Sequence, residues 1–142
     1  MLSKEEKKEY LRSYRAAQKE VEILEEAIKG LRDQEINPAL RQPDGMPKGS
    51  GFHDLSDYAA RLDGLEREWQ AKKWEAVDRY HRVMTDILAI SDETERRLLQ
   101  YRYINGYTWE QIADSMMYSY RWILKLHGRA LEHLRVSEKC SL

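Results

Sequence analysis

The segment from Thr108 to Leu134 constrains the fold of this chain more than any other feature, because it contains two short helix patterns separated by about three residues. Thr108 followed by Gln111 predicts a capping box, because the hydroxyl and the amide can each satisfy an unpaired backbone N–H. Ser119 then predicts the cap of a second helix. Two helices joined in this way are typical of a helix-turn-helix, whose second helix lies in the major groove of DNA.

Apolar residues support both helices at helical spacing. They are Trp109, Ile112, Ala113 and Met116 in the first helix, and Ile123, Leu126, His127, Ala130 and Leu134 in the second. Because His127 falls on the predicted core face, we interpret it as a packed, hydrogen-bonded histidine rather than a metal ligand. Trp122 can wedge against the preceding helix or contact DNA, and the wedge is the favoured interpretation.

The positive charge is concentrated in the second helix. The whole chain has a formal net charge of −1, so a DNA-binding function requires a local excess of cations. Residues 119–135 carry four cations against one acid, a net charge of +3, whereas residues 91–118 carry three cations against five acids, a net charge of −2. This change of sign predicts that only the second helix faces phosphate.

Six residues of the predicted recognition helix, residues 119–134, are candidates for contact with DNA. They are Ser119, Tyr120, Arg121, Leu124, Lys125 and Arg129. The first two turns of such a helix reach the base edges. The planar guanidinium of Arg121 suits guanine O6 and N7, and Lys125 suits either guanine or phosphate.

The remaining candidates suit contacts with thymine or phosphate. Tyr120 and Leu124 can contact a thymine methyl group, and the Tyr120 hydroxyl can alternatively bind phosphate. Arg129 and the helix N-terminus at Ser119 suit phosphate. The alternative interpretation is that the cations simply form a solvated helix face.

A long amphipathic helix is predicted from Lys4 to about Gln34, with apolar residues in heptad spacing. These are Tyr10, Tyr14, Ala17, Val21, Leu24, Ile28 and Leu31. Such a helix can pack inside its own domain or form an intermolecular coiled coil, and the spacing leaves both open. Residues 35–53 hold all three prolines and predict a flexible loop, either a linker or a contact arm.

A second long helix is predicted from about Asp54 to Ile90, so the two long helices suggest an antiparallel hairpin. Trp69 and Trp74 are expected to contribute much of its buried area. A further helix, capped by Ser91 or Asp92, is predicted to brace the helix-turn-helix.

The predicted fold is all-α, with a long, coiled-coil-like helical hairpin followed by a C-terminal three-helix helix-turn-helix domain. The predicted domains are residues 1–90, a hairpin and oligomerisation region containing the loop 35–53, then the DNA-binding domain 91–136 and a tail 137–142. Because a hairpin alone buries little apolar area, we expect a homo-oligomer or a third helix to complete its core.

The stretch RRLLQYRYINGYTWEQIADSM resembles the first half of the sigma-factor domain that reads the −35 promoter element. The continuation YSYRWILKLHGRAL is similar to phage and prophage regulators of Gram-positive bacteria, the ArpU/RinA-like late transcription regulators and their sigma-like relatives. The resemblance implies major-groove recognition, and in several relatives the activation of phage late genes. One departure is Met117, where sigma-like domains often have a glycine in the left-handed conformation.

Other classes of function lack support in the sequence. The single cysteine, Cys140, and four histidines show no zinc-binding spacing, and no phosphate loop or nucleophile motif is present. We therefore expect no enzyme activity, cofactor or metal. No long apolar run predicts a membrane span, the first ten residues lack the apolar core of a signal peptide, and one cysteine suits a reducing compartment, so we expect the cytoplasm of a bacterial host.

Three functional hypotheses follow. The first is a phage-derived transcription regulator that binds double-stranded DNA as a homo-oligomer. The second is a small terminase subunit that recognises a packaging site on DNA. The third is an interaction module that docks on RNA polymerase without specifying DNA alone.

Overall fold

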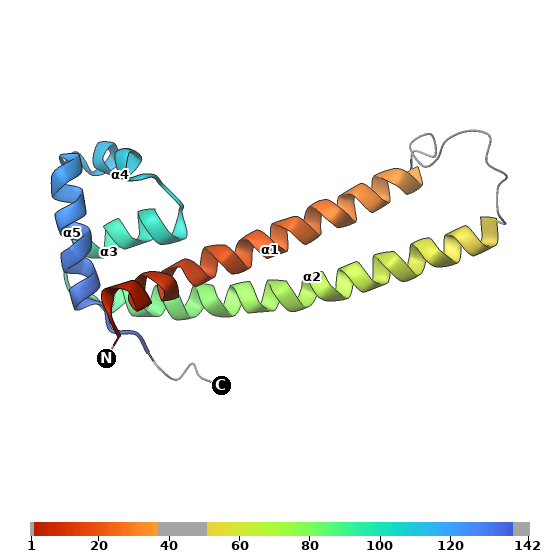
Figure 1. The fold of residues 1–142 in the computed structure, drawn as a ribbon, viewed down its shortest axis with the longest axis horizontal. Helices are drawn as coiled ribbons and strands as arrows, with labels where there is room; N and C mark the ends of the chain where they lie inside the picture. Colours follow the sequence, from red (N-terminus) through yellow and green to blue (C-terminus); the bar gives the residue numbers. More distant parts are fainter. Residues whose placement is uncertain (1, 37–50, 138–142) are drawn as a thin grey trace. The chain divides into compact units, whose positions relative to one another are not determined.

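The computed structural model describes residues 2–36 and 51–137, and Figure 1 shows the path of the chain. Within these ranges the chain forms five α-helices and one π-helix, and no strand. The elements are α1 (Lys4–Ile36), α2 (Gly51–Leu88), α3 (Glu93–Leu99), η2 (Gln100–Ile104), α4 (Trp109–Met116) and α5 (Tyr120–His133). The all-α fold with a long hairpin before a helix-turn-helix is confirmed. None of the described helices is long and apolar enough to cross a membrane.

The bounds of the two long helices differ slightly from the predicted ones. The first ends at Ile36, and the second begins at Gly51 and ends at Leu88 rather than Ile90, so both ends of the predicted loop 35–53 are helical. The rest of that loop, residues 37–50, lies outside the described residues, as does most of the predicted tail.

The structure divides into two compact units. The first, the helix-turn-helix unit, joins Met1–Ala17 to Glu75–Leu142, and the second, the hairpin unit, is Gln18–Trp74. The helix-turn-helix unit thus takes segments from both sides of residue 90. The predicted domain boundary between residues 90 and 91 stays a prediction.

In the hairpin unit, α1 and α2 run antiparallel. Ion pairs join Glu20 to Lys72 at 2.9 Å and Arg32 to Glu66, and the Trp69 indole N–H donates to Glu25 Oε2 at 3.1 Å. As the residue number rises in α1 it falls in α2, as an antiparallel pair requires.

The apolar core of the hairpin unit is thin. Val21 and Ile28 are the buried apolar residues in its described part, and both belong to the predicted heptad stripe. Trp69 is half-buried, but Trp74 is 71% exposed, so the expectation that Trp74 contributes much buried area is wrong for this single chain. Only α1 and α2 are present in the described part of the hairpin unit, so no third helix of that part covers this tryptophan.

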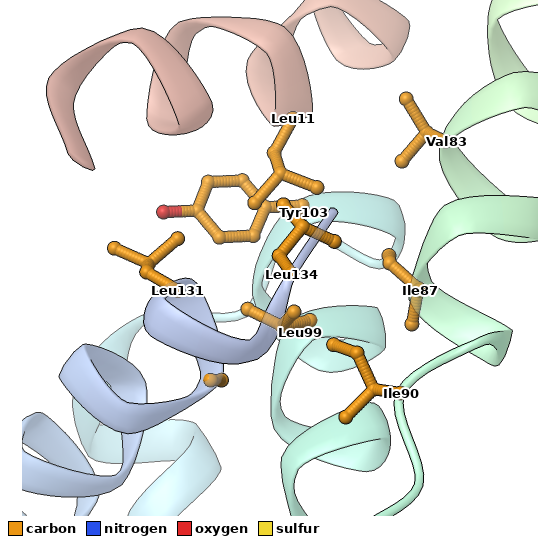
Figure 2. Packing of buried hydrophobic residues seen from close by; sticks show 9 residues of the cluster. Leu11, Val83, Ile87, Ile90, Leu99, Tyr103, Leu131 and Leu134 are labelled. Carbon is orange, nitrogen blue, oxygen red and sulfur yellow. The ribbon is translucent and has the colours of Figure 1, made fainter. Parts of the chain in front are cut away.

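In the helix-turn-helix unit, one apolar cluster gathers side chains from α1, α2, α3, η2 and α5, as Figure 2 shows. Its buried members are Leu11, Val83, Ile87, Ile90, Leu99, Tyr103, Ala130, Leu131 and Leu134. Leu11 is fully buried although it lies outside the predicted heptad stripe of α1. The first turns of α1 therefore belong to the same core as the end of α5.

Polar contacts fasten α1 to its neighbours within this unit. The Lys7 ammonium donates to Leu131 O at 2.8 Å, and the Tyr10 hydroxyl donates to Asp86 Oδ2 at 2.6 Å. The Lys7 ammonium is a second donor to Leu131 O, which also accepts from Leu134 N at 3.3 Å at the end of α5.

The bracing helix differs from a simple α-helix. Asp92 caps α3, since its side chain accepts from Thr94 N at 2.8 Å, but the helix changes to π geometry at Gln100. The N–H of Asn105 bonds back to Gln100 O at 2.9 Å. A π-turn of this kind adds a residue within the helix and changes the direction of the side chains that follow.

Candidate nucleic-acid interface

Local sequence positions both helices of the helix-turn-helix as predicted. The Thr108 hydroxyl accepts from Gln111 N at 3.1 Å, and Gln111 Oε1 accepts from Thr108 N at 2.9 Å, which completes the capping box of α4. Ser119 Oγ accepts from Trp122 N at 3.1 Å and caps α5. Both predicted helix starts are confirmed.

The turn between the helices uses the left-handed conformation without glycine. Met117 has φ 61° and ψ 41°, and its N–H and that of Tyr118 both bond to Ala113 O. A non-glycine residue in this region costs about 1 kcal/mol. The turn therefore keeps the geometry expected of sigma-like domains, and the departure at Met117 does not change it.

The buried face of α5 is the predicted one. Ile123, Leu126, His127, Ala130 and Leu134 are all buried. A second apolar cluster holds α5 against α3 and α4. It consists of Leu98, Ile112, Ala113, Ile123 and Leu126.

His127 is a packed core histidine, as predicted. Its Nε2 lies 2.8 Å from the Tyr103 hydroxyl, and its ring meets the edge of Trp109 with centroids 4.7 Å apart. Burial, and after it the charge of Lys8, lowers the pKa of His127 to about 4. The ring is therefore neutral at pH 7 and can accept the hydroxyl proton of Tyr103. No cluster of metal-binding side chains occurs in the described ranges.

The six predicted contact residues all lie on the exposed surface of α5 or at its cap. Tyr120 is 47% exposed and Leu124 is 41% exposed, and Ser119 and the three cations are exposed as well. Arg121, Lys125 and Arg129 recur every four residues, so they form one stripe along the helix. This stripe faces away from the buried residues of α5.

The charges of this stripe are available to a ligand. Within the described residues, neither Arg121 nor Lys125 has an ion pair or a hydrogen-bonded side-chain partner. The Ser119 hydroxyl accepts the capping bond and still has its own proton to donate, for example to a phosphate oxygen.

Trp122, which the sequence predicts to wedge against α4, is 36% exposed. Its ring meets the edge of Tyr118 in the turn, with centroids 6.4 Å apart, and Arg129 lies over it at 5.7 Å. Trp122 is therefore half-exposed beside the basic stripe. Trp122 and Arg129 are seven residues apart, which places them on one face of the helix, and this spacing indicates their contact in the sequence.

Comparison with known protein families gives one result. Residues 92–136 match the family model Sigma-70, region 4. Region 4 is a DNA-binding helix-turn-helix domain rather than an enzymatic one, and the match covers the bracing helix, α4 and α5. No curated protein and no solved structure matches the chain. The C-terminal segment is thus similar to a DNA-binding domain, and the match does not extend to the hairpin.

Proposed function

We propose that this chain is a sequence-specific, DNA-binding transcription regulator that inserts α5 into the major groove. The observation that carries the proposal is the stripe of Arg121, Lys125 and Arg129, exposed and opposite the buried face of α5. The sigma-like match over the same helices supports it.

Each contact residue has a role that fits its chemistry and position. Arg121 and Lys125, in the first two turns, contact base edges, with the guanidinium of Arg121 suited to guanine. Tyr120 and Leu124 contact a thymine methyl group on one side of the stripe. Arg129 and Ser119 contact phosphate, which fixes the register of the helix on the duplex.

A binding experiment with the full chain tests this site. The preferred duplex is first selected from a random-sequence pool, and affinity is then measured by fluorescence anisotropy. The double variant Arg121→Ala, Lys125→Ala is expected to weaken binding at least tenfold, since one base contact is worth about 1–3 kcal/mol. The matched control is Lys29→Ala, Lys73→Ala, which removes two exposed cations of the hairpin unit. Equal affinities of the two double variants would contradict the proposed site.

We also propose that the hairpin makes the regulator a homo-oligomer. The thin core of the hairpin unit supports this, because Ile23 and Trp74 are 61% and 71% exposed there. A dimer would bind two half-sites and gain affinity that one recognition helix lacks. Trp74→Gln is expected to shift the sedimentation profile toward the monomer, with helix content unchanged. A ring of eight or more subunits would instead favour a small terminase subunit.

The phage or prophage source of the regulator, and its action in the cytoplasm of a bacterial host, belong to the same proposal. The stretch YSYRWILKLHGRAL, similar to ArpU/RinA-like late regulators, supports this source.

A polymerase-binding module is the second candidate, favoured by one observation. Met117 is 88% exposed and Tyr118 is 43% exposed in the turn beside the stripe, and exposed apolar side chains suit a protein partner. Capture of RNA polymerase by a chain that has no DNA affinity at low salt would favour this candidate over the regulator.

A further inference from the structure

The first four turns of α1 carry a second set of cations on one face. Lys4, Lys8, Arg12 and Arg15 are separated by four, four and three residues, which places them along one side of a helix. Residues 1–17 hold five cations against three acids, a net charge of +2. The family match begins at residue 92, so these cations lie outside the sigma-like segment.

Packing in the helix-turn-helix unit brings this face beside α5. Lys4 Nζ lies 3.6 Å from Glu132 Oε2, and a Cβ at Gly128 would lie 3.7 Å from the same ammonium. Lys7 donates to Leu131 O on the adjacent side of α1. The amino end of α1 therefore lies along the C-terminal half of the proposed recognition helix.

Arg102 of η2 adds a cation to the same region. Its guanidinium covers the Trp109 ring at 4.2 Å and, among the described residues, donates one hydrogen bond, to Tyr107 O at 3.1 Å. An arginine has five N–H donors, so most of them remain for a ligand. Burial, and after it the charges of Lys8, Arg102 and Arg12, lower the pKa of the His127 ring, so all three cations act on the same buried side chain.

Arg15 extends the region toward the start of α4. A Cβ at Gly106 would lie 2.5 Å from Arg15 Cζ, and Gly106 has φ 76°, so the absence of a side chain there makes room for the guanidinium. In helix-turn-helix complexes the first helix crosses the DNA backbone. The first helix of this motif is α4, so Arg15 lies next to the turn that leads into the helix expected to cross the DNA backbone.

We propose that Lys8, Arg12, Arg15 and Arg102 form a second phosphate-binding surface, which contacts the backbone of double-stranded DNA beside the bases read by α5. This inference rests on the proposed function, because it extends the same DNA interface. Continuity with the stripe on α5 identifies the ligand as the DNA backbone: the start of α1 lies beside α5, and both surfaces are positively charged.

Two acids compete with this surface and give it a second test. Glu5 pairs with Lys8 at 3.2 Å and Glu9 pairs with Arg12 at 3.6 Å, and both carboxylates are well exposed. Exposed pairs of this kind contribute little stability. A DNA phosphate can therefore displace them, and removal of the acids should strengthen DNA binding.

The experiment measures how the DNA affinity of the full chain depends on salt. Each phosphate contact contributes about 0.9 to the slope of log K against log salt concentration. The variant Lys8→Gln, Arg12→Gln is expected to lower the slope by about two and to keep the base preference, since phosphate contacts carry no sequence information. The control Lys29→Gln, Lys73→Gln makes the same change of net charge in the hairpin unit and should leave the slope unchanged.

The opposite variant guards against a folding defect. Glu5→Gln, Glu9→Gln is expected to tighten DNA binding about threefold or more at low salt, an effect that a loss of structure cannot produce. A slope equal to that of the control, or no gain from the acid-removing variant, would overturn the inference. If the Arg121→Ala, Lys125→Ala variant still loses binding in that case, the proposed function stands without it. No binding of the unaltered chain to any duplex at low salt would overturn both.

Discussion

The Tyr103 hydroxyl and His127 Nε2 lie 2.8 Å apart, with both side chains buried between η2 and α5. Tyr103 belongs to the cluster that holds α1 and α2, whereas His127 contacts Trp109 of the helix-turn-helix. This hydrogen bond therefore joins α5 to the core that supports it.

Acid is expected to destabilise the chain through His127. Burial lowers its pKa in the folded state to about 4, whereas the unfolded ring keeps its ordinary pKa of 6.5. Between these pH values the unfolded chain binds a proton that the folded chain does not, so the free energy of unfolding falls as pH drops. The loss between pH 7 and pH 5 is about 2 kcal/mol, measurable by urea unfolding. His127→Gln, which can still bond to Tyr103 and does not titrate, should remove this part of the pH dependence. An unchanged profile in that variant would contradict the assignment.

Leu11→Ala is expected to lower the free energy of unfolding by about 3 kcal/mol, because it leaves a cavity in the cluster that Figure 2 shows. Ile23→Ala is the matched control, since Ile23 is on the same helix and exposed, and its effect should stay within about 0.5 kcal/mol. Thermal and urea unfolding compare the two. Equal losses would mean that the start of α1 does not pack as described.

Met117→Gly is expected to stabilise the fold by up to about 1 kcal/mol, because glycine adopts the left-handed conformation without strain. The same change at Ser115, in the last turn of α4, should be destabilising, since glycine is a poor residue inside a helix. Melting temperatures of the two variants should thus move in opposite directions. A decrease in both would show that the Met117 side chain contributes more than its backbone strain costs.

The contact between the buried Glu95 side chain and His133 is expected to contribute to the free energy of unfolding. Glu95 is fully buried, its Oε1 lies 2.8 Å from His133 Nδ1, and its Oε2 has no hydrogen-bond partner in the described part of the chain. His133→Ala should therefore cost about 1–3 kcal/mol of stability. The double variant Glu95→Leu, His133→Leu should lose less, because it removes the buried polar group together with its partner. Additive losses in urea unfolding would refute this coupling.

Local sequence patterns were sufficient for the helix starts and for the faces of α4 and α5. Thr108, Ser119 and Asp92 act on backbone groups within the next three residues, so their roles follow from the adjoining sequence. The buried stripe of α5 follows from helical spacing alone. For the same reason the exposure of the proposed DNA-contacting residues could be predicted, although their contact with DNA stays a prediction.

Periodicity failed where burial depends on a second element. Leu11 is buried because α5 and α2 both reach the start of α1, and no spacing along α1 signals that. The sequence also predicts that Trp74 contributes buried area, yet Trp74 is 71% exposed.

The all-α class, the two long helices and the helix-turn-helix with its caps are properties of local sequence, because hydrogen bonds and side-chain spacing within a helix involve residues a few positions apart. The elements that pack against α1 are decided by the tertiary structure instead. Lys8 and Arg12 lie about ninety residues before Arg102 in the chain, yet after burial the charges of all three lower the pKa of His127. Contacts over such separations depend on which surfaces exclude water together, and this selection takes place among whole helices rather than within one.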